Sequence, residues 1–295
     1  MVILTFYVIG DYHYLFETLL MLNSSIINIL SNDHFKRRFG VRYTSFKEMV
    51  KNLQPQWRPK PKRGAKPKCN LEEWLLITLE YWREYRTYFH IGSSWGVSEA
   101  TVCRYVHWVE DALIKVKKFH LPGKKALLEG TVSAVIMDVT EIPIERPKHC
   151  QRRFYSGKKR RHTLKCQLIT DMVSKGIICT FFGKGCQHDF KLFQVSGIYF
   201  HPETKSLVDK GYQGIQKLHS HSELPQKKPR GKPLTPEAKV HNRLLAKKRI
   251  SIEHINGRLK VFRILTGRYR NRRRRFGLRC NLIAALYNLE YAQLA

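Results

Sequence analysis

SAVIMDVTEIPIERP, residues 133–147, is the stretch that decides how the second half of this chain folds. The run is rich in β-forming residues and ends at prolines, a pattern typical of a strand. Asp138 lies in the middle of its apolar part, where a charge is costly unless something compensates it. A metal ion is one possible compensation, and a buried salt bridge is the alternative.

The sequence that follows predicts further strands and then helices. Two apolar runs, residues 160–171 and 176–185, are joined by a short turn that contains Gly176, which predicts a hairpin. The remaining expected elements are a helix over residues 188–200, a short strand over 206–212, a polar, proline-rich loop over 219–240, a long helix from about 238 to 265 and a final helix near 278–292. This order predicts a mixed α/β domain over residues 130–295, with helices flanking the sheet.

Two further acids could join Asp138 in one site. Asp209 ends another short apolar run, and Glu253 lies on the expected long helix. Helical spacing places Glu253 on one face with Arg249 and Lys260, opposite the apolar packing face. On an isolated helix this pattern would be a surface ion-pair ladder.

Beside two aspartates carried by strands, the same glutamate indicates a metal site. Three carboxylates can bind two divalent ions, one activating an attacking oxygen and the other stabilising a leaving oxygen. Oxygen ligands favour Mg²⁺ or Mn²⁺. Arg249 and Lys260 would then hold a phosphate backbone near the metal ions.

Residues 69–125 predict an all-α helix-turn-helix domain that precedes the mixed domain. A first short helix is expected to end near Ser93 and Ser94, followed by a turn over residues 95–97. Ser98 is a plausible N-cap for the second helix. A recognition helix reads bases with its N-terminal residues, which here are Ala100, Thr101 and Arg104. An ordinary three-helix bundle is the alternative.

The charge of the chain favours DNA as the partner of this domain. Lys and Arg number 54 against 23 Asp and Glu, which gives a formal net charge of +31, and the hydrophobic fraction of 43% is that of a globular protein. Such a charge repels itself in a compact fold, and counterion release from nucleic acid is the natural driving force for a polyanionic partner.

Basic residues gather in three segments that could contact DNA. Residues 31–68 begin with a short helical lead-in and end in QWRPKPKRGAKPK, a basic, proline-rich stretch without acids that predicts a flexible linker. This linker is either a solvated tether or an arm that places Arg63 and Lys66 in the minor groove. Two later basic runs are expected to contact phosphates, through Lys158, Lys159, Arg160 and Arg161 in the first and Arg272, Arg273 and Arg274 in the second.

Residues 1–30 are apolar but are interrupted by Asp11, His13 and Glu17. A membrane-spanning helix needs about 20 uninterrupted apolar residues, so we expect no membrane association. The segment is either an amphipathic helix or, if translation starts at Met21, an extension outside the fold. The seven cysteines are scattered without a CxxC pair, which indicates reduced thiols in a cytoplasm.

Several motifs, taken in order, resemble a known family. They are VIMDVTEIPIERP, FYSGKKRRHTLK, QHDFKLF, LVDKGYQG, KKPRGKPLTPEAK, RISIEHINGRLKVFRIL and RYRNRRRRFGLRCNLIAALYNLE. From about residue 31 to the C-terminus the chain closely resembles the DDE transposases of insertion sequences of the IS-five type, relatives of the PIF/Harbinger transposases. The resemblance implies an RNase H-like catalytic domain with Asp138, Asp209 and Glu253 as its acidic triad. It also implies a helix-turn-helix domain that binds the terminal inverted repeats.

The resemblance implies a reaction and a setting as well. The expected enzyme hydrolyses a phosphodiester at the end of its element with Mg²⁺ or Mn²⁺ and transfers the freed 3′ end to target DNA. We expect a homodimer or larger assembly on double-stranded DNA, in a bacterial cytoplasm and associated with the nucleoid. In related transposases the last acid sits in a Tyr-x2-Arg-x3-Glu-x6-Lys signature. Arg249, Glu253 and Lys260 match it, but Ala246 stands at the tyrosine position.

Two other acids are expected to have structural roles. Glu141 lies three residues after Asp138 and should face the other side of the strand, and Asp189 is expected to cap or orient a helix rather than bind metal. Two other functions stay open: a catalytically silent relative that only binds DNA, and another RNase H-like nuclease, such as one acting on RNA–DNA hybrids or Holliday junctions.

Overall fold

The computed structural model describes residues 30–57, 67–229, 231 and 233–293. The chain divides into two compact units, Met1–Lys115 and Val116–Ala295. Each unit is described by itself. The predicted minor-groove residues Arg63 and Lys66, and the apolar segment up to residue 29, lie outside the described residues.

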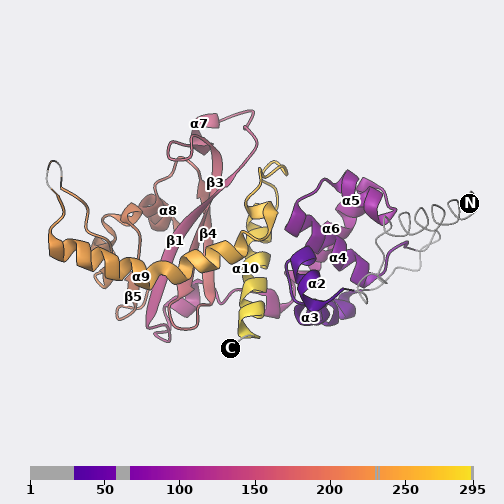
Figure 1. Cartoon of the computed structure of the whole chain (residues 1–295), viewed down its shortest axis with the longest axis horizontal. Helices are drawn as coiled ribbons and strands as arrows, with labels where there is room; N and C mark the ends of the chain where they lie inside the picture. The colour runs from indigo at the N-terminus through magenta and orange to yellow at the C-terminus, as the bar shows by residue number, and fades with distance from the viewer. Residues whose placement is uncertain (1–29, 58–66, 230, 232, 294–295) are drawn as a thin grey trace, which may run out of the picture. The chain divides into compact units, whose positions relative to one another are not determined.

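The described part of the first unit is helical (Figure 1). Its elements are α2 (Asn32–Phe39), α3 (Tyr43–Leu53), the 3₁₀ turn η2 (Gln54–Gln56), α4 (Leu71–Glu84), α5 (Tyr88–Trp95) and α6 (Glu99–Leu113). Helix α4 packs against α6, and α5 packs against both. Glu80 is buried in α4 and accepts hydrogen bonds from the Trp95 indole (2.9 Å) and the Arg86 guanidinium (2.9 Å). These bonds satisfy a buried carboxylate and tie α5 to α4.

The helix-turn-helix predicted from the sequence is present as α5 and α6. Gly96 ends α5 in the left-handed region, with φ of 63°, so this helix runs through Trp95 and ends slightly later than expected. The Ser98 hydroxyl accepts a hydrogen bond from the Thr101 backbone N–H, which confirms the predicted N-cap. The predicted apolar face of α6 is buried, and it consists of Val102, Val106, Val109 and Leu113.

The second unit is built on a mixed sheet. Its strands are β1 (Ala134–Pro143), β2 (Tyr155–Ser156), β3 (Arg161–Asp171), β4 (Ile177–Lys184), β5 (Lys205–Leu207) and β6 (Ser222–Glu223). The order across the sheet is β4-β3-β1-β5-β6, and β2 pairs with the start of β3. The β1–β3 and β3–β4 pairs are antiparallel, whereas β1–β5 and β5–β6 are parallel. The predicted hairpin is therefore the β3–β4 pair.

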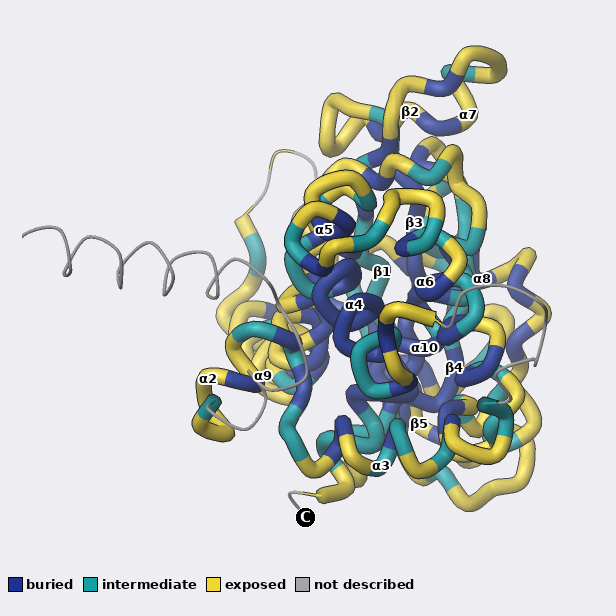
Figure 2. The backbone as a smooth tube through the Cα atoms, turned by 90° about the vertical axis from the view of Figure 1, so that its right-hand side faces the viewer, coloured by how far each residue is buried: buried dark blue, intermediate teal, exposed yellow. Residues whose placement is uncertain are grey.

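Helices cover both faces of this sheet (Figure 1). The elements are α7 (Gln151–Phe154), α8 (Asp189–Ser196), the 3₁₀ turns η3 (Lys117–Phe119), η4 (Lys124–Leu127), η5 (Lys210–Tyr212), η6 (Ile215–Lys217) and η7 (Arg263–Leu265), and the long helices α9 (Pro236–Leu259) and α10 (Phe276–Ala292). Val135 and Met137 of β1 belong to the same buried cluster as Phe193 of α8. Ile136 packs on the other face with Leu245 and Ile252 of α9. Residues 135–137 of β1 are buried, whereas the loops around α7 and β2 are mostly exposed and are yellow in Figure 2.

Local signals explain where the helices differ from the sequence expectation. Gly197 adopts a φ of 60° and ends α8 at Ser196, before the expected end at residue 200. Thr235 caps α9 through a hydrogen bond from the Ala238 backbone N–H, and Pro236 fits the first helical position. The expected loop over residues 219–240 therefore ends earlier, and it also contains the short strand β6.

The close packing of α5 on the turn before α6 gives a first prediction. A Cβ added at Gly92 would lie 2.5 Å from the Val97 carbonyl oxygen, so the backbone would have to move. Gly92→Ala is expected to destabilise the first unit by about 1–3 kcal/mol, as overpacking does. All five tryptophans lie between residues 57 and 108, so urea unfolding followed by tryptophan fluorescence reports on this unit.

Ser93→Ala is the matched control, because Ser93 is the exposed neighbour of Gly92 on the same helix. A Gly92→Ala protein as stable as the Ser93→Ala protein would contradict the packing described here.

Candidate active site

Asp138 lies on β1, and Asp209 follows β5, the strand that pairs parallel with β1. Ile136 of β1 pairs with Leu207 of β5, and each aspartate lies two residues further along its strand direction. Residues two apart on a strand share a face, so Asp138 lies on the Ile136 side of β1, which α9 covers. The parallel pairing therefore brings both carboxylates close together at the C-terminal end of β5.

Helix α9 places a cation and an amide against these acids. An Arg249 guanidinium N–H donates to Asp209 Oδ1 (Nη1 to Oδ1, 3.3 Å), and Nη2 lies 3.9 Å from Asp138 Oδ1. The Asn256 amide donates to Asp138 Oδ2 at 2.8 Å. Arg249 and Asn256 are seven residues apart and so return to the same side of the helix. The arginine side chain is only 13% exposed.

This placement corrects one expectation from the sequence. The apolar face predicted for α9 is right, since Ile252, Ile255 and Leu259 are buried. Arg249, however, is directed inward to the two aspartates and is largely buried, whereas Glu253 and Lys260 are both exposed. Besides its apolar residues, α9 turns Arg249 and Asn256 toward the sheet, because the helix passes over the two aspartates. Arg249 is needed there to compensate them.

Glu253 does not join the two aspartates in this structure. It is exposed on α9, one helical turn after Arg249 and nearly one turn before Asn256. Among the described residues, no group of three or more His, Cys, Asp or Glu side chains is close enough together to hold a metal ion. Ala246, at the place of the signature tyrosine, is exposed on the same helix.

The electrostatics of Asp138 are those of a carboxylate that lacks full compensation. Burial raises its pKa above the ordinary value of 3.8, and the nearby charges of Asp209 and Asp189 raise it further. Arg249 and the Val139 backbone N–H act in the opposite direction without overcoming burial. A group held in this way gains from additional positive charge nearby.

The atoms around these acids fit a hard cation. Asp138 and Asp209 offer carboxylate oxygens, and the Asn256 side-chain oxygen is buried beside them with no hydrogen-bond partner among the described residues. Carboxylate and amide oxygens are ligands that Mg²⁺ and related ions accept. Asn256 was not singled out from the sequence, although its spacing of seven residues from Arg249 is a signal that could have found it.

The opposite face of β1 carries a second polar group. Glu141 lies there as expected, and Thr163 donates a hydrogen bond to it. Lys165 of β3, which the sequence analysis missed as a site residue, is buried and ion-pairs with Asp189 at 2.8 Å. Asp189 does not cap α8, because it is the first helical residue and His188 holds the N-cap position.

The structure places the two predicted basic runs of the second unit near the same end of β1. Lys158 to Arg161 lie exposed after β2, with Arg161 opening β3, and Arg272 to Arg274 lie exposed before α10. The Arg273 guanidinium stacks 4.6 Å from the centre of the Phe154 ring, and Tyr269 donates its backbone N–H to Pro143 at the end of β1. Both runs therefore lie near the C-terminal end of β1.

The predicted base-reading residues of the first unit lie at the start of α6. Ala100 and Arg104 are exposed and Thr101 is half-buried. Arg104 donates to the Thr101 hydroxyl at 3.0 Å. In the second unit, the predicted phosphate-binding residue Lys260 is exposed directly after α9. These positions are accessible to a ligand, and none of them is taken up in the core.

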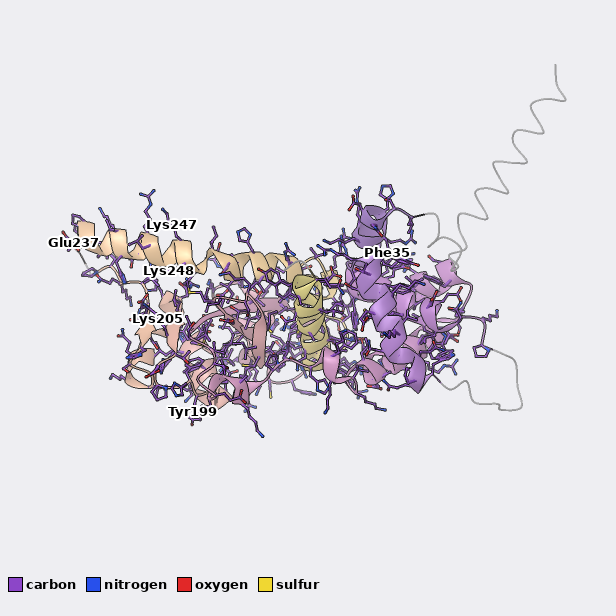
Figure 3. All side chains as sticks on the ribbon, turned by 90° about the horizontal axis from the view of Figure 1, so that it is seen from below. Phe35, Tyr199, Lys205, Glu237, Lys247 and Lys248 are labelled. Carbon is purple, nitrogen blue, oxygen red and sulfur yellow. The ribbon has the colours of Figure 1, made fainter. Side chains whose placement is uncertain are left out.

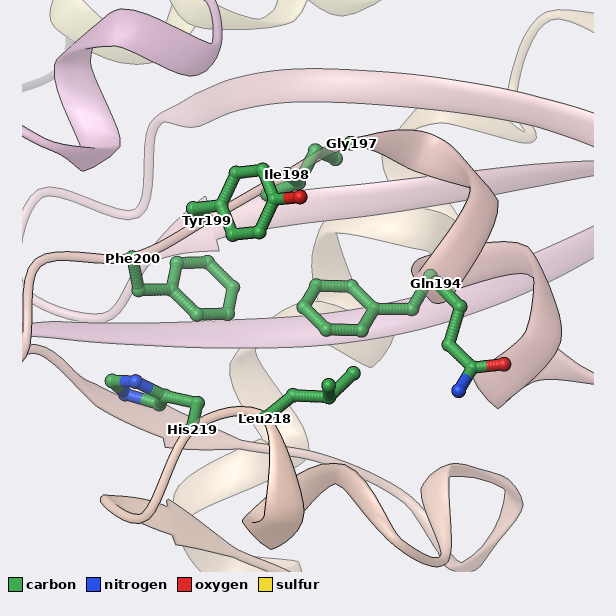
Figure 4. Close-up of a pocket in the computed structure, with 8 residues that line it drawn as sticks. Gln194, Gly197, Ile198, Tyr199, Phe200, Leu218 and His219 are labelled. Atoms are coloured by element: carbon green, nitrogen blue, oxygen red, sulfur yellow. The ribbon is translucent and has the colours of Figure 1, made fainter.

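A pocket of about 230 Å³ opens elsewhere in the second unit (Figure 4). Phe193, Phe200 and His219 line it. The His219 ring is hydrogen-bonded to the carbonyl oxygen of Thr204, the residue before β5. Asp209 follows the other end of β5. The pocket is therefore separate from the paired aspartates.

Family models match both units. Residues 137–288 match the model described as DDE superfamily endonuclease, and residues 67–118 match the helix-turn-helix of DDE superfamily endonuclease. The first match covers more than half of the chain and contains all three predicted acids. The chain belongs to the DDE superfamily of endonucleases.

Two similar proteins narrow this class. The chain is 52% identical over 260 residues to a protein of Microchaete diplosiphon named as the probable transposase for insertion sequence element IS702, which covers 88% of this chain and 94% of the relative. It is 24% identical over 231 residues to a protein of Streptomyces albus G named as a transposase for insertion sequence element IS112, covering 77% and 83%. The chain is thus a DDE-type transposase with a helix-turn-helix DNA-binding domain. Within the described residues, no helix has the length and apolarity needed to cross a membrane.

The raised pKa of Asp138 predicts how stability depends on pH when metal is removed. Because the folded state holds this proton more tightly than the unfolded chain, stability falls as pH rises from about the ordinary value of 3.8 through the raised pKa. The free energy of unfolding of the wild type, relative to Asp138→Asn, should therefore decrease across that window. Unfolding in chelator, followed by far-ultraviolet circular dichroism, measures it.

Asp171 supplies a control of opposite sign. Burial alone would raise its pKa, but hydrogen bonds from Ser174 and Val173 lower it overall. The wild type should therefore gain stability relative to Asp171→Asn as pH rises toward the ordinary value of 3.8. The free energy of unfolding of the wild type would then be compared with that of Asp138→Asn and of Asp171→Asn. If both differences changed with pH in the same direction, the account of Asp138 would be contradicted.

Proposed function

We propose that this transposase cuts DNA at the ends of its element and transfers the freed 3′ end to target DNA, with Asp138, Asp209 and Glu253 holding divalent metal ions. The placement of Asp138 on β1 beside Asp209, which follows the neighbouring parallel strand β5, is the observation that supports this proposal. Two neighbouring carboxylates are costly to hold together, and binding a cation is the function that such a pair serves best.

We also propose that the second unit is an RNase H-like domain. Its sheet has three antiparallel strands, β4-β3-β1, extended past β1 by the parallel strands β5 and β6. The first acid lies on the central strand and the second follows the next strand, while the helix that carries the third packs on β1. This arrangement supports the fold that the motifs imply.

The chain's own residues would prepare the site in three ways. Asp138 and Asp209 supply oxygens that are already close to each other through their shared partner Arg249. Arg249 compensates both carboxylates in the metal-free protein, and its guanidinium could bind a DNA phosphate once their charge is compensated otherwise. Glu253, one turn along α9, would complete the ligand set by turning its exposed side chain toward the aspartates.

Bound Mg²⁺ or Mn²⁺ would supply an activated oxygen nucleophile and stabilise the leaving oxygen at the phosphate. No covalent bond between protein and DNA is needed, because water attacks in the first displacement and the freed 3′-hydroxyl in the second. Both displacements would use the same acids.

DNA would be held by both units. In the first, Ala100, Thr101 and Arg104 would read the terminal inverted repeat in the major groove. In the second, Lys158 to Arg161, Arg272 to Arg274 and Lys260 would bind phosphates. Arg63 and Lys66 would follow the minor groove. Because an element has two ends, we propose a dimer or larger assembly on DNA, working in the cytoplasm at the nucleoid.

Replacing each proposed ligand tests the enzyme against a catalytically silent DNA-binding protein. Asp138→Ala, Asp209→Ala and Glu253→Ala should each lower Mg²⁺-dependent cleavage of terminal-repeat DNA by at least about a hundredfold, the scale of losing a group that stabilises transition-state charge. Affinity for the same DNA should stay within about twofold, because the helix-turn-helix is untouched. Cleavage assays and filter binding measure the two quantities.

Glu237→Ala is the matched control for Glu253→Ala, because both remove one exposed negative charge from α9. Figure 3 labels Glu237 near the start of that helix, far along it from the aspartates. Full cleavage by the Asp138→Ala protein would refute the assignment of the acids.

Two other variants should distinguish residues that read the base sequence from residues that bind phosphates. Arg104→Ala is expected to weaken binding to the terminal repeat by about 1–3 kcal/mol and to leave random duplex binding nearly unchanged. Lys159→Ala should weaken both DNAs equally and reduce the salt dependence of binding by about one counterion. Binding titrations over a range of salt concentrations measure both effects. Equal losses of Arg104→Ala on both DNAs would exclude a base-reading role.

A further inference from the structure

Lys165 is a buried cation on the face of the sheet away from Arg249. It lies in the middle of β3 with an exposure of 7%, and its ammonium is 2.8 Å from Asp189 Oδ1 and 3.8 Å from Glu141 Oε1. A buried ammonium is retained at a cost that only close, hydrogen-bonded partners offset. The residue therefore has a task that an apolar side chain in the same strand could not perform.

The Asp189 carboxylate links Lys165 to the turn that follows Asp209. One of its oxygens accepts from Lys165, and the other lies against the backbone of Gly211. A Cβ at Gly211 would stand 2.7 Å from Asp189 Oδ2, so a larger residue there would displace the Asp189 carboxylate from Lys165. Helix α8, which begins with Asp189, also contacts the 3₁₀ turn η5 that contains Gly211.

Tyr212 anchors the same turn from its other side. Its side chain is fully buried, and its hydroxyl donates to Gln167 Oε1 at 3.4 Å. Gln167 is the next residue after Lys165 on the same face of β3. The turn after Asp209 is thus held to β3 at two successive positions, by Lys165 through Asp189 and by Gln167 through Tyr212.

Asp209 needs such an anchor because the sheet fixes it only weakly. Strand β5 is three residues long and ends at Leu207. The last ladder bond before Asp209 is donated by the Val208 N–H to the Glu223 carbonyl oxygen, at 3.0 Å. Beyond it the chain enters a single 3₁₀ turn, and metal ligands must be held to within about 0.5 Å of their productive positions.

We propose that Lys165 is a positioning residue for metal binding: through Asp189 and the glycine contact at Gly211, it fixes the turn that presents the Asp209 carboxylate beside Asp138. This role rests on the proposed function, because it concerns the same acids. Lys165 itself touches neither metal nor DNA, and it acts only through Asp189.

The test measures the Mn²⁺ affinity of the full chain, stripped of metal, by electron paramagnetic resonance. Lys165→Met, Asp189→Asn and Gly211→Ala disturb the two successive contacts that join Lys165 to Asp189 and Asp189 to Gly211. Each should raise the Mn²⁺ dissociation constant about 10- to 100-fold, the range found when partners that orient metal ligands are lost. Affinity for terminal-repeat DNA should not change, since α6 is untouched.

Gly211→Ala still tests the proposal if Lys165→Met fails to fold, because it removes no charge and only displaces the Asp189 carboxylate. Lys165→Met combined with Asp189→Asn should be no worse than the more affected single variant, since the two residues act as one unit. Lys205→Met is the control. It removes a lysine from an ion pair with Glu223 at the start of β5 and should leave Mn²⁺ affinity within about twofold of the wild type.

Two results would overturn the proposal in distinguishable ways. If Asp209→Asn loses Mn²⁺ binding while folded Lys165→Met and Gly211→Ala proteins bind it as the wild type does, the positioning role is wrong and the metal site stands. If Asp138→Asn and Asp209→Asn both retain wild-type Mn²⁺ affinity, the metal site fails, and the role of Lys165 fails with it.

Discussion

The second unit depends on how two carboxylates are held together where the short strand β5 ends beside β1. The parallel pairing of β1 with β5 places Asp138 and Asp209 close together, and burial raises the pKa of Asp138. Such a pair repels itself and loses solvation, so it requires positive charge or hydrogen-bond donors nearby. Arg249 and Asn256 supply these from α9, which explains why an arginine and an asparagine stand on the side of this helix that meets the sheet.

The two faces of the sheet act on the same acids in different ways. On the α9 face, Arg249 compensates the carboxylates directly. On the α8 face, Lys165 and Asp189 hold the turn after Asp209 without touching the acid itself. The positive charge beyond the end of β1 adds a third contribution. Arg273 of the second basic run stacks there on Phe154, four residues before the first run, and we propose that the two runs bind DNA phosphates.

Much of this could be predicted from local patterns, and the rest depends on tertiary contacts. The hairpin, the Ser98 cap and the apolar face of α6 follow from spacing and turn chemistry, and the structure confirms them. The burial of Arg249 against the aspartates was not predicted, because helical phasing cannot show which groups of the sheet the helix meets. Lys165 escaped notice because its partner Asp189 is 24 residues away and reaches it only after α8 folds onto β3. The placement of the two basic runs near the same end of β1 is likewise invisible to any local pattern.

The central claim is that Asp138, Asp209 and Glu253 together hold divalent metal, with Arg249 standing in for that charge in the metal-free protein. Anomalous diffraction from crystals of the transposase with terminal-repeat DNA and Mn²⁺ tests it most directly. The account predicts manganese bound by oxygens of all three acids, with Arg249 turned from Asp209 toward a phosphate. Manganese bound elsewhere, with Arg249 still between the two aspartates, would contradict it.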